Sequence, residues 1–262
     1  MAYWVAVAIG AAVCTGLCVG ARRRPGRWVD VAGWLLAAVL LADAAVFLID
    51  PLVDGSWTVQ RSLPFPLCDV ALILAAVALI RPRWWPVVEL TYFWGLAGTL
   101  QAVATPDLTA SFPHLQFLEY VVGHVGIVVT ALFLVVGRRL RPRDGAVPRV
   151  WFLTAAFMLL SGLVDALTGA NYNFLERLPG RDSLLSVLGP WPWYLVAAAA
   201  LAVVVLVVLD LPFRRPGSRA VGGWLSAAVG FIPTAVPGAA RAGPSPGRPS
   251  GALRRSARRR HV

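Results

Sequence analysis

The sequence predicts an all-α protein, a bundle of transmembrane helices. Of the 262 residues, 58% are hydrophobic and only 14% are charged, and the mean hydropathy is +0.70. A soluble chain carries nearer a quarter charged residues. Several apolar runs also exceed the ~18 residues that indicate a membrane span. The chain is therefore expected to be a multi-pass protein of the cell membrane.

Seven apolar runs are long enough, or placed so regularly, that each is predicted to be a span. The first run has no basic residues before it and is followed by Arg22, Arg23 and Arg24, so it is expected to stay as a span and not to be a cleaved signal peptide. The predicted spans are residues 3–20, 29–49, 66–80, 84–104, 114–137, 150–170 and 191–212.

The arginines predict the orientation of these spans. Every basic residue is an arginine, and 21 of the 24 fall on one side if the spans alternate. The other side has only Arg61, Arg177 and Arg181. Because basic residues accumulate on the cytoplasmic side, the sequence predicts an N-terminus outside and a C-terminus inside.

The chain divides into a predicted seven-helix domain, residues 1–213, and a basic tail, residues 214–262. The tail is rich in Pro, Gly, Ser, Ala and Arg, and is expected to be disordered and to contact anionic lipid headgroups. Its apolar patch at 221–236 is interrupted by glycines and Pro233, so a short interfacial helix is a second interpretation. The arginines lie between apolar runs and in the tail, which indicates topology and no nucleic-acid partner.

Three cysteines are present, and two of them lie in the first apolar run. Cys14 and Cys18 are predicted to be small buried residues, because no His or carboxylate lies nearby to complete a metal site. We therefore expect no metal and no cofactor. The third, Cys68, follows Pro64-Phe65-Pro66 and precedes Asp69 at the start of a short apolar helix.

Polar groups from five predicted spans fall at one depth. Counted from the nearest inner arginine at ~1.5 Å per residue, they lie ~18–24 Å above the inner boundary. In a hydrocarbon core ~30 Å thick, such groups are costly unless they face the bundle interior. The set comprises Asp43, Cys68, Asp69, Thr99, His124 and Asp165, with Gln101 slightly higher.

Cys68 and His124 are the leading candidates within this layer. Cys68 is either a small buried residue or a nucleophile, since a helix N-terminus and a nearby imidazole both favour the thiolate. His124 is either a structural histidine or the general base for Cys68. Asp69 and Asp165 either join helices by hydrogen bonds or orient His124. Glu89 lies well below the layer, and pairing with a cytoplasmic arginine is the favoured interpretation.

Two aromatic and amide-rich segments lie at the outer ends of the last two spans. Trp and Tyr are common at membrane interfaces, but the segment with Trp191, Trp193 and Tyr194 can also cover a cavity for a lipid headgroup. Asn171 or Gln101 can donate to an oxyanion, and Tyr172 lies beside Asn171. We expect these residues to bind substrate.

Five blocks of the sequence resemble a known family. They are Leu63–Val70, Glu89–Gln101 with Thr105–Asp107, the surroundings of His124, Asn171–Leu175, and Leu188–Tyr194. Together they resemble the YwaF-type family of bacterial seven-span membrane proteins. That family is similar to a eukaryotic multispan acyltransferase that moves polyunsaturated acyl chains onto lyso ether phospholipids. In that relative a cysteine and a histidine are the proposed catalytic pair, and they match Cys68 and His124.

The resemblance implies a phospholipid acyltransferase or transacylase, with a Cys-His pair in a cavity toward the outer leaflet and membrane lipids as its substrates. Two other hypotheses remain open. Buried carboxylates are also typical of transporters and lipid-binding proteins, although no pair of broken-helix repeats is visible. A scaffold without chemistry is the third.

Overall fold

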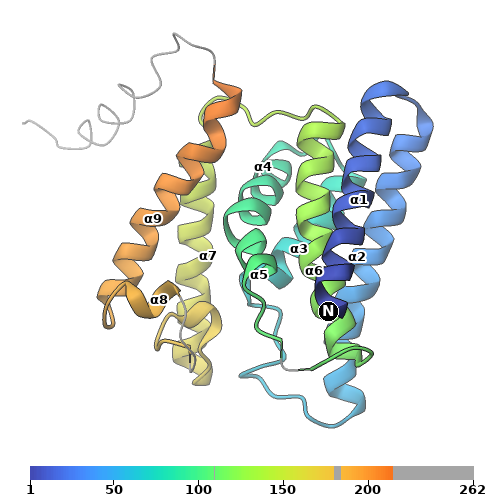
Figure 1. Ribbon diagram of the computed structural model, residues 1–262. Coiled ribbons are helices and arrows are strands. Elements are labelled where there is room, and N and C mark those ends of the chain that lie inside the picture. The colour runs from blue at the N-terminus through green and yellow to red at the C-terminus, as the bar shows by residue number, and fades with distance from the viewer. Residues whose placement is uncertain (109, 180–183, 215–262) are drawn as a thin grey trace, which may run out of the picture. The chain divides into compact units, whose positions relative to one another are not determined.

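The computed structural model describes residues 1–108, 110–179 and 184–214, and every regular element in these residues is a helix (Figure 1). Most of the predicted tail lies outside the described residues. The elements are α1 (Ala2–Arg23), α2 (Arg27–Val53), α3 (Leu67–Ile80), α4 (Trp85–Trp94), the π-helix η1 (Gly95–Thr99), α5 (Leu100–Ala104), α6 (Leu115–Leu132), the π-helix η2 (Phe133–Gly137), α7 (Ala146–Thr168), the 3-10 helix η3 (Tyr172–Phe174), α8 (Leu184–Val187), α9 (Trp193–Asp210) and the 3-10 helix η4 (Leu211–Phe213).

Five helices of the described residues are long and apolar enough to cross a membrane. They are α1, α2, the continuous segment Leu115–Gly137, α7, and the segment Trp193–Phe213. The prediction of a helical protein with several membrane spans is therefore confirmed. The other two predicted spans correspond to α3, which has 14 residues, and to the run of α4, η1 and α5. The total of seven and the orientation remain predictions.

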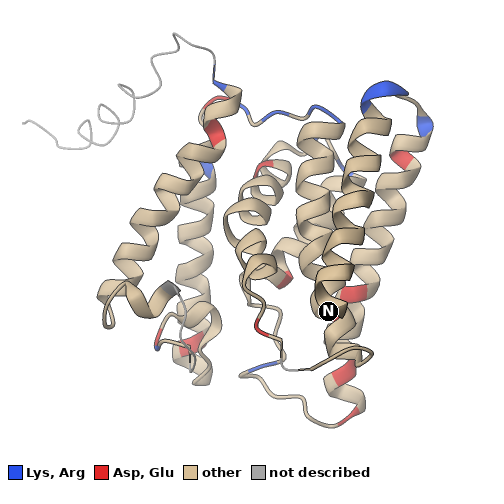
Figure 2. Cartoon of the chain, viewed as in Figure 1, with Lys and Arg blue, Asp and Glu red and all other residues tan. Residues whose placement is uncertain are grey.

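Successive long segments run in alternating directions through the bundle (Figure 1). As a result, the turn after α1 and the loop between η2 and α7 both lie at one end, where most of the described arginines gather (Figure 2). We call this the arginine end, formed by residues 22–27, 81–83 and 138–149. The cysteine end is the opposite one, where α3 and α6 begin. The positive-inside rule predicts that the arginine end faces the cytoplasm.

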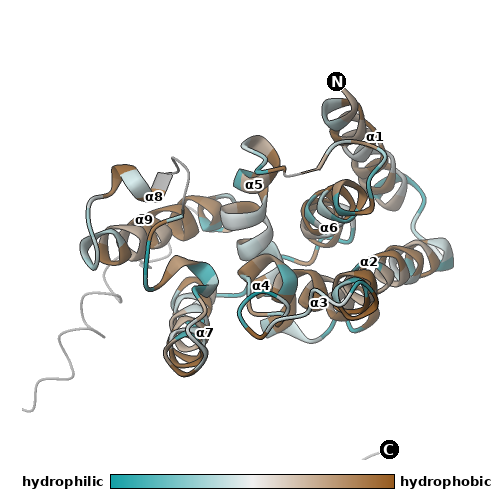
Figure 3. Ribbon diagram, turned by 90° about the horizontal axis from the view of Figure 1, so that it is seen from below, coloured by the Kyte–Doolittle hydropathy of each residue, from teal (hydrophilic) through white to brown (hydrophobic). Residues whose placement is uncertain are grey.

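The interior of the bundle is built around α3, which lies between α2 and α4 when seen along the bundle (Figure 3). Small side chains of α3 are almost fully buried, among them Ala71, Ala75 and Ala76. They pack in one core with Phe93 of α4 and Phe133 of η2. Small residues let helix backbones approach closely, which is how membrane helices associate without a hydrophobic driving force.

Two glycines of α6 allow α2 to pack closely against it. A Cβ atom at Gly126 would lie 2.6 Å from Leu40 Cδ2, and one at Gly123 would lie 2.8 Å from Asp43 Oδ2. Real Cβ atoms do not approach other atoms so closely, so a larger residue at either position would require the Leu40 or the Asp43 side chain to shift. This contact brings the carboxylate of Asp43 against the turn of α6 that carries His124.

The last two long helices attach to the rest mainly through α4. Trp94 Nε1 donates to Thr154 Oγ1 of α7 at 2.8 Å, and Tyr92 OH donates to the Leu209 carbonyl of α9 at 3.0 Å. Elsewhere α7 exposes large apolar side chains, including Phe152, Leu159 and Leu167. Exposed apolar faces of this kind suit contact with lipid tails.

Candidate functional site

The segment before α3 is held in place by the residues that follow α7. Asn173 Nδ2 donates to the Phe65 carbonyl at 3.0 Å, and the Leu67 N–H donates to Asn173 Oδ1 at 2.8 Å. Asn173 Nδ2 also donates to Ser161 Oγ of α7 at 3.0 Å. One amide side chain thus caps the start of α3 and fixes the proline-rich entry. The sequence predicted that this entry is special but did not identify its partner.

Tyr172 supports the same segment one step earlier along the chain. Its hydroxyl donates to the Val59 carbonyl at 2.7 Å and accepts a hydrogen bond from the Leu63 N–H at 3.2 Å. Burial raises the pKa of Tyr172, which keeps the phenol protonated and able to donate. Tyr172 was predicted to bind substrate. In the structure, its hydroxyl instead holds the segment before α3 through these two hydrogen bonds.

Cys68 is the second residue of α3. Its Sγ lies 3.9 Å from Thr99 Oγ1 of η1, and Thr99 is fully buried. Pro66 precedes the helix without a side-chain cap of its own. No hydrogen bond from the Cys68 N–H is seen within the described residues. A free N–H and a thiol therefore lie together at a helix N-terminus, where the backbone carries partial positive charge.

His124 is fixed by its own helix. Its Nδ1 lies 2.8 Å from the Tyr120 carbonyl, and because a carbonyl only accepts, Nδ1 carries the proton. The ring stacks on Tyr120 with centroids 4.1 Å apart, and Tyr120 OH donates to the Ala102 carbonyl at 2.9 Å. In the neutral imidazole, Nε2 is then left with a lone pair that can accept a proton.

Tyr120 interacts with both candidate catalytic residues. It is close enough to Cys68 for the two groups to interact electrostatically, and its ring covers one face of His124. Within the described residues, Cys68 and His124 are not joined by a direct hydrogen bond. Tyr120 was missed by the sequence reasoning, although it stands one helical turn before His124, a spacing that places both on one face.

Three carboxylates lie near this group. Asp43, Asp69 and Glu119 are close enough to interact with one another, and Asp43 also lies against Gly123. One oxygen of Asp69 is buried and has no hydrogen-bond partner. None of the ion pairs among the described residues involves these three side chains. Glu119 was also missed, although it stands five residues before His124.

Of the two interpretations of Asp165, the structure shows structural hydrogen bonding. The residue is fully buried, and its Oδ1 accepts from the Tyr172 N–H at 2.8 Å. No hydrogen bond to His124 exists among the described residues, so Asp165 instead secures the turn that carries Asn173. Asn171 is also engaged locally, because its oxygen accepts from the N–H groups of Glu176 and Arg177.

The remaining predicted substrate-binding residues differ in exposure. Gln101 is exposed at the end of the run from α4 to α5. Trp191 and Trp193 are 60% and 66% exposed, and Trp191 Nε1 donates to the Leu175 carbonyl at 3.1 Å. Tyr194 is buried and its hydroxyl donates to the Phe174 carbonyl. Trp191 and Tyr194 thus hold the turn after η3, and Trp193 remains open to the surroundings.

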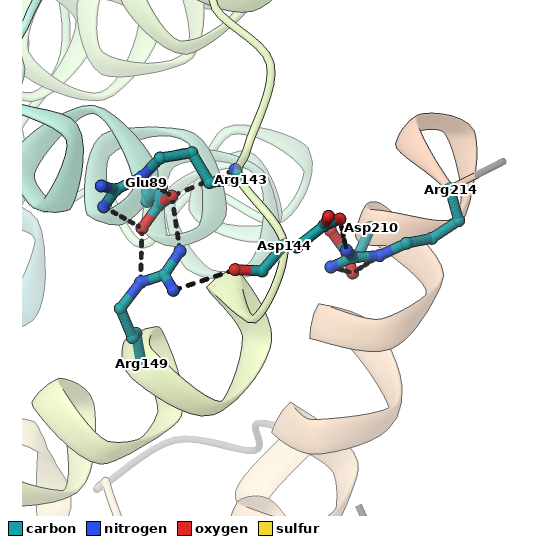
Figure 4. A network of polar contacts seen from close by, with 6 residues as sticks. All are labelled: Glu89, Arg143, Asp144, Arg149, Asp210 and Arg214. Atoms are coloured by element: carbon teal, nitrogen blue, oxygen red, sulfur yellow. Dashed lines mark hydrogen bonds and ion pairs between the residues drawn. The ribbon is translucent and has the colours of Figure 1, made fainter. Parts of the chain in front are cut away.

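The arginine end contains a network of charged side chains (Figure 4). Glu89 is 1% exposed and accepts hydrogen bonds from Arg143 and from Arg149, with Nε of Arg143 at 3.0 Å and NH2 of Arg149 at 2.9 Å. Arg214 links Asp210 of α9 to Asp144 in the loop before α7. The expected pairing of Glu89 with arginines is therefore confirmed. Cys14 and Cys18 are buried and free, as expected.

The apolar helices, the small-residue core and the arginines gathered at one end define a membrane protein with several transmembrane helices. The chain belongs to the TMEM164 family, whose model matches residues 1–210. The match covers both Cys68 and His124 and ends at the last residue of α9. No curated protein and no solved structure is significantly similar to this chain.

Proposed function

We propose that this TMEM164-family protein transfers acyl chains between phospholipids, with Cys68 as the nucleophile. The observation that carries the proposal is a thiol at the N-terminus of α3, beside Thr99 and within electrostatic range of Tyr120, whose ring stacks on His124. The resemblance of the sequence blocks to the YwaF-type family, and through it to a phospholipid acyltransferase, supports the same assignment.

In the proposed first step, Nε2 of His124 takes the thiol proton and the thiolate attacks the ester carbonyl of a donor phospholipid. The tetrahedral oxyanion accepts hydrogen bonds from the Cys68 N–H and from the Thr99 hydroxyl. Its collapse breaks the ester bond. The lysophospholipid alkoxide leaves with the proton from His124, and the acyl chain remains on Cys68 as a thioester.

In the second step, His124 takes the proton of an acceptor hydroxyl, which attacks the thioester. The thiolate leaves and regains its proton from His124, so atoms and charge balance over the cycle. The proposal requires Sγ and Nε2 to come together when substrate binds, since no direct hydrogen bond joins them in the described residues. Such bonds often tighten only when substrate is bound.

Asp69 or Asp43 would stabilise the imidazolium that forms during each step. Asp43 lies against Gly123, the neighbour of His124, and Asp69 follows Cys68 in the chain, whereas Asp165 is bonded to Tyr172. The proposal includes seven spans with the N-terminus outside, so that the cysteine end opens toward the outer leaflet of the cell membrane.

Acyl exchange by the purified protein in phospholipid nanodiscs tests the proposal. We expect Cys68→Ala and His124→Ala each to lower the rate by at least about a hundredfold, since a nucleophile and its base both act in the transition state. Cys18→Ala, a buried cysteine of α1, is the matched control and keeps the rate. Exchange that persists in Cys68→Ala excludes the mechanism.

The unpaired carboxylates favour a second candidate, a transporter or lipid-binding protein without catalysis. Asp43, Asp69 and Glu119 lie together without an arginine partner among the described residues, as expected of a proton or cation path. Uptake into vesicles that depends on Asp43 but not on Cys68 would select this function over acyl transfer.

A further inference from the structure

The arginine end contains a cavity that neither the acyl-transfer proposal nor the bundle core uses. Its volume is about 440 Å³, within the range of ligand-binding pockets. The walls come from the turn between α1 and α2, the turn between α3 and α4, and the end of η2. Cys68 lies in the first turn of α3 and this cavity lies beyond its other end, so the two sites are at opposite ends of the same helix.

The walls of the cavity carry an excess of positive charge. Four arginines line it, Arg22, Arg83, Arg138 and Arg139, against the single carboxylate of Asp30. Arg138 forms an ion pair with Asp30, and Nε of Arg22 donates to the Val136 carbonyl at 2.9 Å. The side chains of Arg83 and Arg139 have no ion pair within the described residues. With Arg22, which bonds only a backbone carbonyl, three guanidinium groups of the cavity have no carboxylate partner among the described residues.

Arg138 shows that the site is preorganised. Its side chain is 8% exposed, held over the Phe133 ring and bonded to the Val29 carbonyl at 3.1 Å. Its Nε is nevertheless buried without a hydrogen-bond partner. A buried N–H of a charged group is costly to leave unsatisfied, and here the Arg138 guanidinium lacks an acceptor.

The N-terminus of α2 forms another wall. Gly26 precedes this 27-residue helix, and no side chain caps its first turn, although the Val29 N–H donates to the Gly26 carbonyl at 3.0 Å. A helix N-terminus carries partial positive charge and its free N–H groups bind anions. Arginine forks and helix amides together are the usual elements of a phosphate site.

We propose that this cavity binds a phosphate-bearing anion. The site is independent of acyl transfer, because none of its lining residues belongs to the group around Cys68. The same chemistry has two sources. A phospholipid headgroup fits the position of the cavity at the ends of transmembrane helices, where headgroups lie, and a soluble phosphate compound can reach it from the aqueous side.

Binding by the full-length protein in nanodiscs tests the proposal in two arms. The first arm measures retention of phosphatidic acid against phosphatidylcholine by native mass spectrometry. The second measures pyrophosphate binding by calorimetry. We expect the double variant R83Q/R139Q to lower the affinity for phosphatidic acid or for pyrophosphate, whichever of the two binds, by at least about tenfold. This is the size expected for the loss of two charge-assisted contacts. Both side chains lack ion pairs among the described residues, so the fold is expected to remain intact.

Arg141→Gln is the matched control, because Arg141 is an exposed arginine of the same loop that does not line the cavity. It is expected to bind as the unaltered protein does. Asp30→Asn is expected to bind several-fold more tightly, since it removes the only carboxylate and frees Arg138. Retention of phosphatidic acid identifies a lipid headgroup, and pyrophosphate binding alone identifies a soluble ligand. If neither arm separates R83Q/R139Q from Arg141→Gln, the proposal is wrong.

Discussion

The carboxylates at the two ends of the bundle differ in whether they have arginine partners. At the arginine end, Glu89, Asp30, Asp144 and Asp210 are each bonded to an arginine. At the cysteine end, Asp43, Asp69 and Glu119 have no such partner among the described residues, and the local structure is held by neutral hydrogen bonds and close glycine contacts. The paired carboxylates of the arginine end connect helices and loops. The unpaired carboxylates of the cysteine end are the ones to which we assign a role in the proposed function.

The largest effect is expected for Glu89→Gln. The glutamine amide would place an N–H₂ group against the guanidinium donors of Arg143 and Arg149, and the buried charge compensation would be lost. We expect a loss of about 3 kcal/mol in the free energy of unfolding, measured by denaturant titration in detergent. Asp144→Asn, an exposed carboxylate of the same network, is the control and is expected to change little. Equal effects of the two would contradict the comparison.

The next largest effect is expected for Gly123→Ala at the cysteine end. The new Cβ would lie 2.8 Å from Asp43 Oδ2 and 3.2 Å from Leu72 Cδ1, so these two side chains would have to shift. We expect a loss of about 2 kcal/mol in the free energy of unfolding. Gly16→Ala in α1 is the matched control, because nothing lies within 4 Å of its Cβ position. If Gly123→Ala left the free energy of unfolding unchanged, the contact of Gly123 with Asp43 and Leu72 would not be close-packed.

Asn173→Ala is expected to have a moderate effect on stability and a clear effect on the cysteine. It removes the hydrogen bonds to Phe65, Leu67 and Ser161. We expect the free energy of unfolding to fall by about 1–2 kcal/mol. The freed entry segment should let a membrane-permeant maleimide alkylate Cys68 faster. Asn171→Ala, whose bonds are local to 176 and 177, should leave the alkylation rate unchanged. Identical rates in both variants would refute the bracing role of Asn173.

The smallest effect, and one of opposite sign, is expected for Asp43→Asn. Removing one of several neighbouring carboxylates that lack a cation relieves repulsion and the cost of burial. The free energy of unfolding should rise by up to about 1 kcal/mol, seen as a higher melting temperature in detergent. If Asp43→Asn destabilised the protein as much as Glu89→Gln, Asp43 would be a stabilising, paired carboxylate like Glu89, and the comparison would fail.

The sequence predicted the helices well because membrane spans leave strong local signals. The predicted span at 66–80 became α3, Leu67–Ile80, since prolines mark its start and Arg81 its end. Hydropathy did not reveal the π-helices at Gly95–Thr99 and Phe133–Gly137, because an extra residue in a helical turn changes no composition. The pairing of Glu89 was predictable, since a buried carboxylate near an arginine-rich boundary has an obvious partner.

The candidate site was only partly predictable. Counting depth from the arginines brought Cys68, Thr99 and Asp43 to one level, and the structure places Thr99 beside Cys68 and Asp43 beside Gly123. The same count also included Asp165, which bonds to Tyr172 instead. Equal depth does not say which face of a helix a side chain occupies. The contact of Asn173 with Leu67 spans 106 positions and has no local signature.

That long separation has a consequence for how the protein is made. The start of α3 receives its cap from Asn173, and the preceding loop receives its hydrogen bonds from Tyr172. Both residues are synthesised after α7. The entry segment therefore cannot reach its final conformation while the early helices are leaving the translocon. The segment can be held in place only after the sixth predicted span and the residues that follow it have been made. In a nascent chain stalled earlier, the segment before Cys68 therefore lacks these hydrogen bonds.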